Sequence, residues 1–133
     1  MDSIDFLTRK GATCTDLLSC LYNLKPVDLA VLCEVAKREN ATLDQIAEAV
    51  ERDRSSTHRC LAKLVSAGLV HKQSRTLKSG GYYHVYSIVE PSKIKDQARQ
   101  RVNDITMGLE DLVERFENDF NRQLTSKSQE QNK

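Results

Sequence analysis

Hydrogen-bond donors and cations gather in one short stretch of the chain, between residues 52 and 63. Arginine side chains bind guanine edges and phosphates, and serine and histidine side chains add further hydrogen bonds to either. If residues 53–69 form a helix, most of these groups lie in its first two turns, where a recognition helix meets the major groove of DNA. The sequence therefore predicts DNA contacts from Arg52, Arg54, Ser55, Ser56, His58, Arg59 and Lys63.

The charge of the chain is distributed unevenly. The formal net charge is only +1, which by itself indicates no nucleic-acid partner. Residues 52–84, however, hold seven Lys or Arg side chains, one acidic residue and all three histidines. A local charge of +6, which leaves −5 for the rest of the chain, favours a nucleic-acid-binding surface over a helix face that is merely solvated.

The other side of this predicted helix is apolar. Asp53 is a typical N-cap residue, and Gly68 is typical of a helix end. Between them and just beyond, small or apolar side chains recur near the 3.6-residue helical period at Thr57, Cys60, Leu61, Leu64, Val65 and Leu69. This face is predicted to pack on a core, which leaves the donor-rich face exposed.

Three shorter helices are predicted upstream. Residues 16–24 form the first, and Pro26 opens the second over residues 27–38, with a buried stripe of Val27, Val31, Leu32, Val35 and Ala36. Thr42 and Gln45 form a capping box that opens the third, which runs through Val50. Only residues 51–53 separate it from the donor-rich helix, so the two must cross at a large angle, as in a helix-turn-helix.

Two extended segments follow, over residues 70–77 and 82–89. The second alternates aromatic and β-branched residues, and a glycine-bearing tip separates the two, so the pattern predicts a β-hairpin. A hairpin directly after a helix-turn-helix is typical of a winged helix. The alternative is a hairpin that only covers the core; as a wing, it would contact the DNA backbone or minor groove through Lys72, Arg75, Lys78, Ser79 and Gly80.

The last element is a long amphipathic helix over residues 94–124, which begins after Pro91. Its apolar positions follow a mixed three- and four-residue spacing close to that of a coiled coil. So long a stripe exceeds what one small domain buries, so we expect homodimerisation through Ile94, Ala98, Val102, Ile105, Leu109, Leu112, Phe116 and Phe120.

These elements predict a mostly α-helical (α+β) fold, a winged helix-turn-helix with a long C-terminal dimerisation helix. Residues 1–13 would form a flexible arm, 14–90 the DNA-binding domain, 91–124 the dimerisation helix and 125–133 a disordered tail. No apolar run spans a bilayer and no secretion signal is visible, so a cytoplasmic location is expected.

The four cysteines are Cys14, Cys20, Cys33 and Cys60, and no two of them form a C-x-x-C pair. We expect them to be small buried apolar residues, with a thiol switch or a metal site of the first three as the alternative. The sequence has neither a glycine-rich phosphate loop nor an H-E-x-x-H motif. We therefore predict no enzymatic activity, no cofactor and no metal site, including one formed by the three histidines.

The stretches LDQIAEAVERDRSSTHRCLAKLVSAGLVHK and GGYYHVYS resemble the winged-helix domain of archaeal regulators of the TrmB type, which is akin to MarR-like domains. The resemblance implies a dimer that binds promoter DNA and alters transcription. Carried over by position, it implies that Arg54, Ser55, Ser56 and Arg59 face the groove, while residues 78–81 touch the backbone. Thr57 departs from the aliphatic residue expected there. The absence of the C-terminal sugar-binding domain of larger members implies no sugar effector.

We therefore expect a sequence-specific regulator whose dimer reads an inverted-repeat operator in double-stranded DNA. Two alternatives remain open: a winged-helix adaptor in a transcription or chromosome complex that reads no sequence, and a regulator whose DNA binding responds to cysteine oxidation or metal. The operator, the target genes and the direction of regulation do not follow from the sequence.

Overall fold

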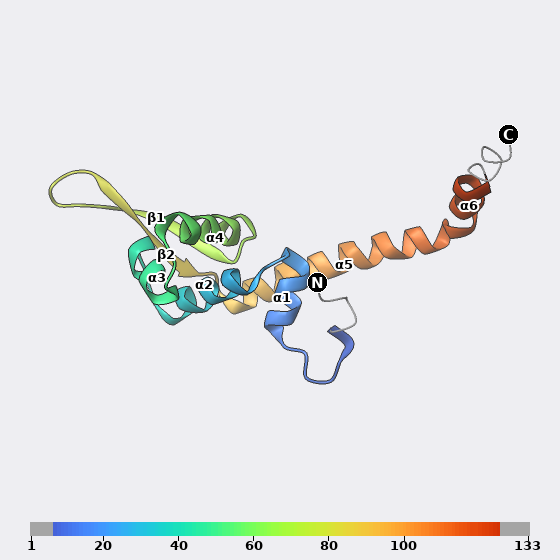
Figure 1. The fold of residues 1–133 in the computed structure, drawn as a ribbon, viewed down its shortest axis with the longest axis horizontal. Coiled ribbons are helices and arrows are strands. Elements are labelled where there is room, and N and C mark those ends of the chain that lie inside the picture. Colours follow the sequence, from blue (N-terminus) through green and yellow to red (C-terminus); the bar gives the residue numbers. More distant parts are fainter. Residues whose placement is uncertain (1–6, 126–133) are drawn as a thin grey trace. The chain divides into compact units, whose positions relative to one another are not determined.

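The computed structural model describes residues 7–125, and Figure 1 traces the elements in chain order. They are α1 (Cys14–Tyr22), α2 (Pro26–Lys37), α3 (Leu43–Val50), α4 (Arg54–Ser66), β1 (Val70–Thr76), β2 (Tyr82–Ile88), α5 (Pro91–Glu114), α6 (Phe116–Phe120) and the π-helix η2 (Asn121–Thr125). Residues 1–6 of the predicted arm (1–13) and residues 126–133 of the predicted tail (125–133) lie outside the described residues.

The caps at the starts of α3 and α4 form as predicted. The backbone N–H of Gln45 donates to the Thr42 hydroxyl at 3.2 Å, and the Thr42 N–H donates to the Gln45 side chain at 3.0 Å. At the start of α4, the Asp53 carboxylate accepts from the Ser56 N–H at 3.3 Å. These caps fix where each helix begins, and the short link between them produces the predicted helix-turn-helix.

The first helix differs from its prediction at both ends. It begins at Cys14 because the Asp16 carboxylate accepts from the backbone N–H of Thr13 at 2.8 Å, which stabilises an earlier start. It ends at Tyr22 because Asn23 adopts a left-handed conformation with a φ of 55°. In α2, Val31, Leu32 and Val35 are buried as predicted and Val27 is half-buried, but Ala36 is exposed.

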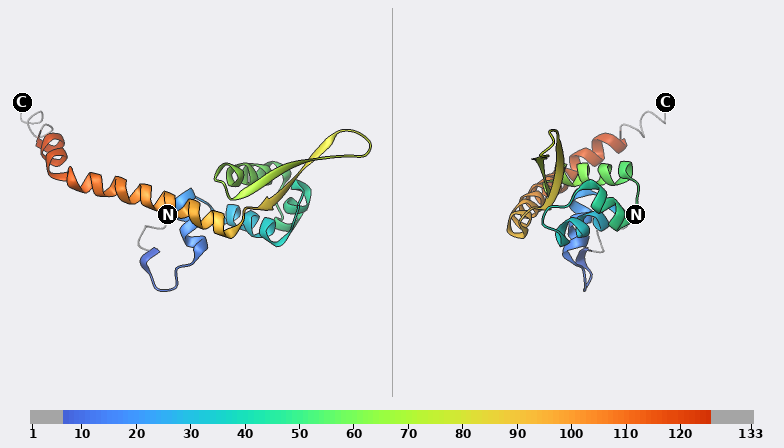
Figure 2. Two further views of the ribbon diagram at one scale, coloured as in Figure 1. Left: turned by 180° about the vertical axis from the view of Figure 1, so that it is seen from behind. Right: turned by 90° about the vertical axis from the view of Figure 1, so that its left-hand side faces the viewer.

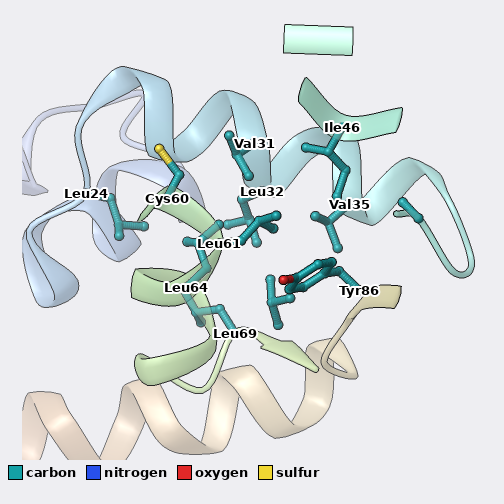
Figure 3. Packing of buried hydrophobic residues seen from close by; sticks show 12 residues of the cluster. Leu24, Val31, Leu32, Val35, Ile46, Cys60, Leu61, Leu64, Leu69 and Tyr86 are labelled. Carbon is teal, nitrogen blue, oxygen red and sulfur yellow. The ribbon is translucent and has the colours of Figure 1, made fainter. Parts of the chain in front are cut away.

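The core lies between α2, α3, α4 and the hairpin. Figure 3 shows Leu61 and Leu64 of α4 among the side chains of α2, with Tyr86 of β2 closing the cluster. Thr57 is also buried, and its hydroxyl donates to the carbonyl of Asp53 at 2.9 Å. This hydrogen bond explains why a threonine is tolerated where an aliphatic residue was expected.

The two strands form the predicted antiparallel hairpin, with Val70 opposite Ile88 and Thr76 opposite Tyr82. Its base is tied to the loop before α3 by a β-bridge. In that bridge, Tyr86 N–H donates to the Ala41 carbonyl at 2.7 Å, and Ala41 N–H donates back at 3.0 Å. Together with α3 and α4, the hairpin completes a winged helix-turn-helix, as the sequence predicted.

The chain divides into two compact units, residues 1–98 and 99–133, so the division falls within α5 and not at its start. In the first unit, Ile94 packs against the core and Ala98 is buried. Their own domain therefore covers Ala98 and part of Ile94, and the predicted contact of these two residues with a second subunit stays a prediction. The apolar stripe left exposed in the second unit begins at Val102.

The predicted continuous helix to Leu124 is interrupted. Helix α5 ends at Glu114, and Arg115 adopts φ −86° and ψ 0° before the short α6 begins. The interruption falls at Arg115, directly before the sequence FENDFN, whose phenylalanine, asparagine and aspartate residues all have low intrinsic helix propensity.

Candidate nucleic-acid interface

Helix α4 presents the predicted donors on its solvent side. Arg54, Ser55, His58 and Arg59 are exposed, while Thr57, Cys60, Leu61 and Leu64 are buried on the opposite side. Ser56 lies at the edge, half-buried, and its hydroxyl accepts from the Arg59 guanidinium at 3.4 Å. Arg52 is exposed in the turn before the helix. These donors are therefore accessible to a ligand.

A cleft of about 630 Å³ separates the start of α4 from the hairpin, which lies alongside α4 in both views of Figure 2. Two cationic or titratable side chains of α4 open onto it, Arg54 and His58. The remaining wall combines the first turn of α3 with aromatic residues of β2; it consists of Thr42, Leu43, Asp44, Leu77, Tyr82, Tyr83, His84 and Tyr86.

A smaller groove of about 220 Å³ continues along the same side of α4, and His58 lines both hollows. Ala62 and Ser66 also line this groove, although sequence reasoning did not select them. They lie four and eight residues after His58, so the ordinary i, i+4 series along one helix face was a signal that would have found them.

The hairpin does not present its cations on one face. Lys72 pairs with Tyr86 and lines the groove beside α4. Arg75 pairs with Tyr83 three residues further along β1, so its side chain leaves the opposite face of the pleated strand. Lys78, Ser79 and Gly80 at the tip are exposed. The predicted wing residues are therefore accessible, but only Lys72 lies next to α4.

Lys63 differs from its prediction. Its ammonium group donates to the buried Asp28 carboxylate at 2.8 Å and to the Asn23 carbonyl at 2.7 Å. Burial raises the pKa of Asp28, but hydrogen bonds from Lys63, the Lys25 N–H and the Cys60 thiol outweigh this and lower it overall. Lys63 thus belongs to an internal ion pair between α2 and α4, because it lies beside the buried stripe and not opposite it.

Asp44 is an acidic residue of this surface that sequence reasoning missed. Its carboxylate lies 2.9 Å from the Arg54 guanidinium, and the two side chains are 69% and 66% exposed. Asp44 lies in the first turn of α3, ten positions before Arg54, so no short-range pattern in the sequence indicated the pair.

The cysteines are mostly not buried, contrary to expectation. Cys14, Cys20 and Cys33 are exposed, because α1 and α2 bury only one face each. Only Cys60 is buried, and burial together with the neighbouring Asp28 raises the pKa of its thiol to about 11. Within residues 7–125, the structure brings together no three His, Cys, Asp or Glu side chains in an arrangement that would hold a metal ion. Nor is any helix in that range long and apolar enough to cross a membrane.

Comparison with known proteins identifies relatives of this chain. An uncharacterised protein of Methanocaldococcus jannaschii is 30% identical over 105 residues, which cover 79% of this chain and 80% of the relative. A second uncharacterised protein of the same organism is 28% identical and covers 71% of this chain and 78% of its own length.

Solved structures share the fold. A possible transcriptional regulator from Methanosarcina mazei superposes with a TM-score of 0.71 at 21% identity, over 88% of this chain and 96% of that one. A Sulfolobus tokodaii protein gives a TM-score of 0.59 at 20% identity, over 71% and 93% of the two chains.

The family model described as "sugar-specific transcriptional regulator TrmB" matches residues 18–92, which run from α1 to the start of α5 and include the whole helix-turn-helix and hairpin. The match covers more than half of the chain, and it includes every residue of the surface described above. The protein belongs to the TrmB family of transcriptional regulators.

Proposed function

We propose that this protein is a sequence-specific DNA-binding regulator that acts as a homodimer. In this proposal the exposed face of α4 enters the major groove, and the hairpin tip contacts the phosphate backbone or the minor groove. Arg54 and Arg59 read base edges, His58 and Ser55 support them, and Lys72 and Lys78 contact phosphates. The observation that carries the proposal is the exposure of the α4 donors beside a basic hairpin, on a helix whose other face is fully packed.

The exposed apolar stripe of the second unit supports the dimer. Within the described residues, Val102, Ile105, Leu109, Leu112 and Phe116 recur at three- and four-residue steps and are between 38% and 59% exposed. Such a stripe is unfavourable in water and typical of a helix that packs on a second copy. A symmetric dimer places two copies of α4 in successive major grooves, roughly 34 Å apart, so the operator is an inverted repeat.

Selection of bound fragments from random duplex DNA at about 150 mM salt tests this function directly, because phosphate contacts alone are weakened there. We expect enrichment of an inverted repeat with half-sites about ten base pairs apart, centre to centre. Binding without enrichment, which simply fades as salt rises, would overturn the proposal and favour an adaptor that reads no sequence.

Replacement of Arg59 by alanine should relax the sequence preference. A bidentate arginine contact to guanine contributes about 1 to 3 kcal/mol of discrimination, which the exposed Arg59 supplies in this proposal. Competition binding with the selected operator and with single-base variants of it measures this loss.

The matched control is Lys78→Ala in the exposed hairpin tip. It should weaken binding to all sequences alike and lower the slope of log affinity against log salt by about one. An Arg59→Ala variant that keeps the full preference for the operator would remove Arg59 from the reading surface.

A further inference from the structure

The cleft beside α4 has one acidic residue, Asp44, among the side chains that line it. Asp44 opens the first turn of α3, and its Oδ1 lies 2.9 Å from Nη1 of Arg54, the first residue of α4. Both side chains line the 630 Å³ cleft together with His58 and the aromatic residues of β2. The ion pair therefore sits at the end of α4 that leads into the DNA groove in the proposed binding mode.

Stability does not account for this pair. Both side chains are about two-thirds exposed, and an ion pair so exposed contributes little to folding because water screens it. A carboxylate near DNA is also repelled by the phosphates and lowers overall affinity. In the proposed binding mode, Asp44 thus lowers the affinity for DNA in general. A favourable effect of Asp44 would therefore be a difference in affinity between DNA sequences.

We propose that Asp44 determines specificity by holding the guanidinium of Arg54; the inference rests on the proposed DNA-binding function. A long arginine side chain loses conformational freedom when it contacts a base, and a carboxylate that already fixes it reduces that loss. On a wrong sequence, Arg54 would instead turn to a phosphate, and Asp44 competes for it there. Both effects widen the gap between the right and the wrong DNA, which is what specificity requires.

The test is Asp44→Asn, which keeps the side-chain size and removes the charge. Fluorescence anisotropy should be measured on the selected operator and on a scrambled duplex over a series of salt concentrations. We expect scrambled DNA to bind up to about fivefold more tightly, as for the loss of an exposed charge interaction. The salt slope on that duplex should steepen by about 0.9 as Arg54 gains a phosphate. The ratio of operator to scrambled affinity should fall by about three- to tenfold, part of the discrimination of one arginine–guanine contact.

Glu48→Gln is the matched control. Glu48 is exposed one turn further along α3, so its replacement makes the same change in net charge away from Arg54. It should leave the affinity ratio unchanged. The Asp44→Asn change should also lose its effect on that ratio in an Arg54→Ala background, because the carboxylate then has no guanidinium to hold. Arg54→Lys, which keeps the charge without the planar fork, tests the same pair should Asp44→Asn unfold.

The outcomes separate the two proposals. A wild-type protein that does not prefer any duplex over the scrambled one refutes the DNA-reading function, and this inference with it. A selective wild type whose affinity ratio is unchanged by Asp44→Asn, or lowered equally by Glu48→Gln, overturns only the role of Asp44.

Discussion

Replacement of Ile105 and Leu109 together by glutamate should convert the protein to a monomer and lower its affinity for the operator by about 10²- to 10⁴-fold. Both residues lie on the exposed stripe of α5, where buried carboxylates opposite a second copy would be strongly unfavourable. The loss on DNA is large because the second half-site is bound intramolecularly in a dimer and independently in two monomers. Sedimentation analysis gives the oligomeric state, and anisotropy with the operator gives the affinity.

The control for this variant is Met107→Glu. Met107 is 68% exposed and equally apolar, but it is two residues from Ile105, about 200° around the helix at 100° per residue. A dimer through the stripe predicts that Met107→Glu stays dimeric and binds normally. A wild-type protein that sediments as a monomer at the concentrations used for DNA binding, or a double variant that remains a dimer, would contradict the predicted interface.

Replacement of Asp28 by asparagine should lower the free energy of unfolding by about 2 to 4 kcal/mol, the second large effect that we expect. Breaking a buried ion pair from one side typically costs about 3 to 5 kcal/mol. The expected value is lower here because Lys63 is 35% exposed and can turn partly to water. Urea unfolding measures the change. The exposed pair of Asp44 and Arg54 provides the comparison: Asp44→Asn should lower the free energy of unfolding by at most about 1 kcal/mol.

In acid, the difference in the free energy of unfolding between Asp28→Asn and wild type should disappear. The pKa of Asp28 is lowered from an ordinary value of 3.8, so its stabilising effect is fully present above that value and is lost as the pH falls through the lowered pKa. The two unfolding curves should therefore differ at about pH 7 and approach each other below about pH 4. A constant difference at every pH would show that the charge of Asp28 is not what stabilises the fold.

A double variant isolates the pair itself. Lys63→Met keeps most of the side-chain length. The double variant Asp28→Asn with Lys63→Met removes both charges, so no unpaired charge is left at this buried position. The double variant should lose less stability than the sum of the two single changes, because each single change alone strands one charged group. Strict additivity would mean that the two groups act independently.

The elements that could be predicted from the sequence are those fixed by near neighbours. The Thr42–Gln45 capping box joins residues three apart, as does the Asp53 cap, and both form with the expected donors and acceptors. The buried stripe of α4 and the alternating strand β2 follow from periodicity alone. The fold and the family, both confirmed, were therefore accessible from local patterns.

What the sequence missed depends on contacts between distant segments. Lys63 looks like a DNA-facing cation until its partner, 35 positions earlier, is brought beside it. Ile94 and Ala98 continue the apolar stripe of α5 in the sequence, and only the packed domain reveals that Ala98 is buried and Ile94 partly buried within it. Two of the exposed cysteines, Cys20 and Cys33, have an apolar neighbour in the sequence, but neighbours along a helix do not share a face. The roles given to the α4 and hairpin residues on DNA stay predictions.

The Ala41–Tyr86 bridge divides the hairpin into an anchored base and an exposed tip. It anchors the buried base of β2 to the helix-turn-helix through two backbone hydrogen bonds, which do not depend on side-chain identity. Residues 77–83 beyond it are exposed, so changes there do not disturb the core. Changes of length or charge in this tip should therefore leave the packing of the core intact.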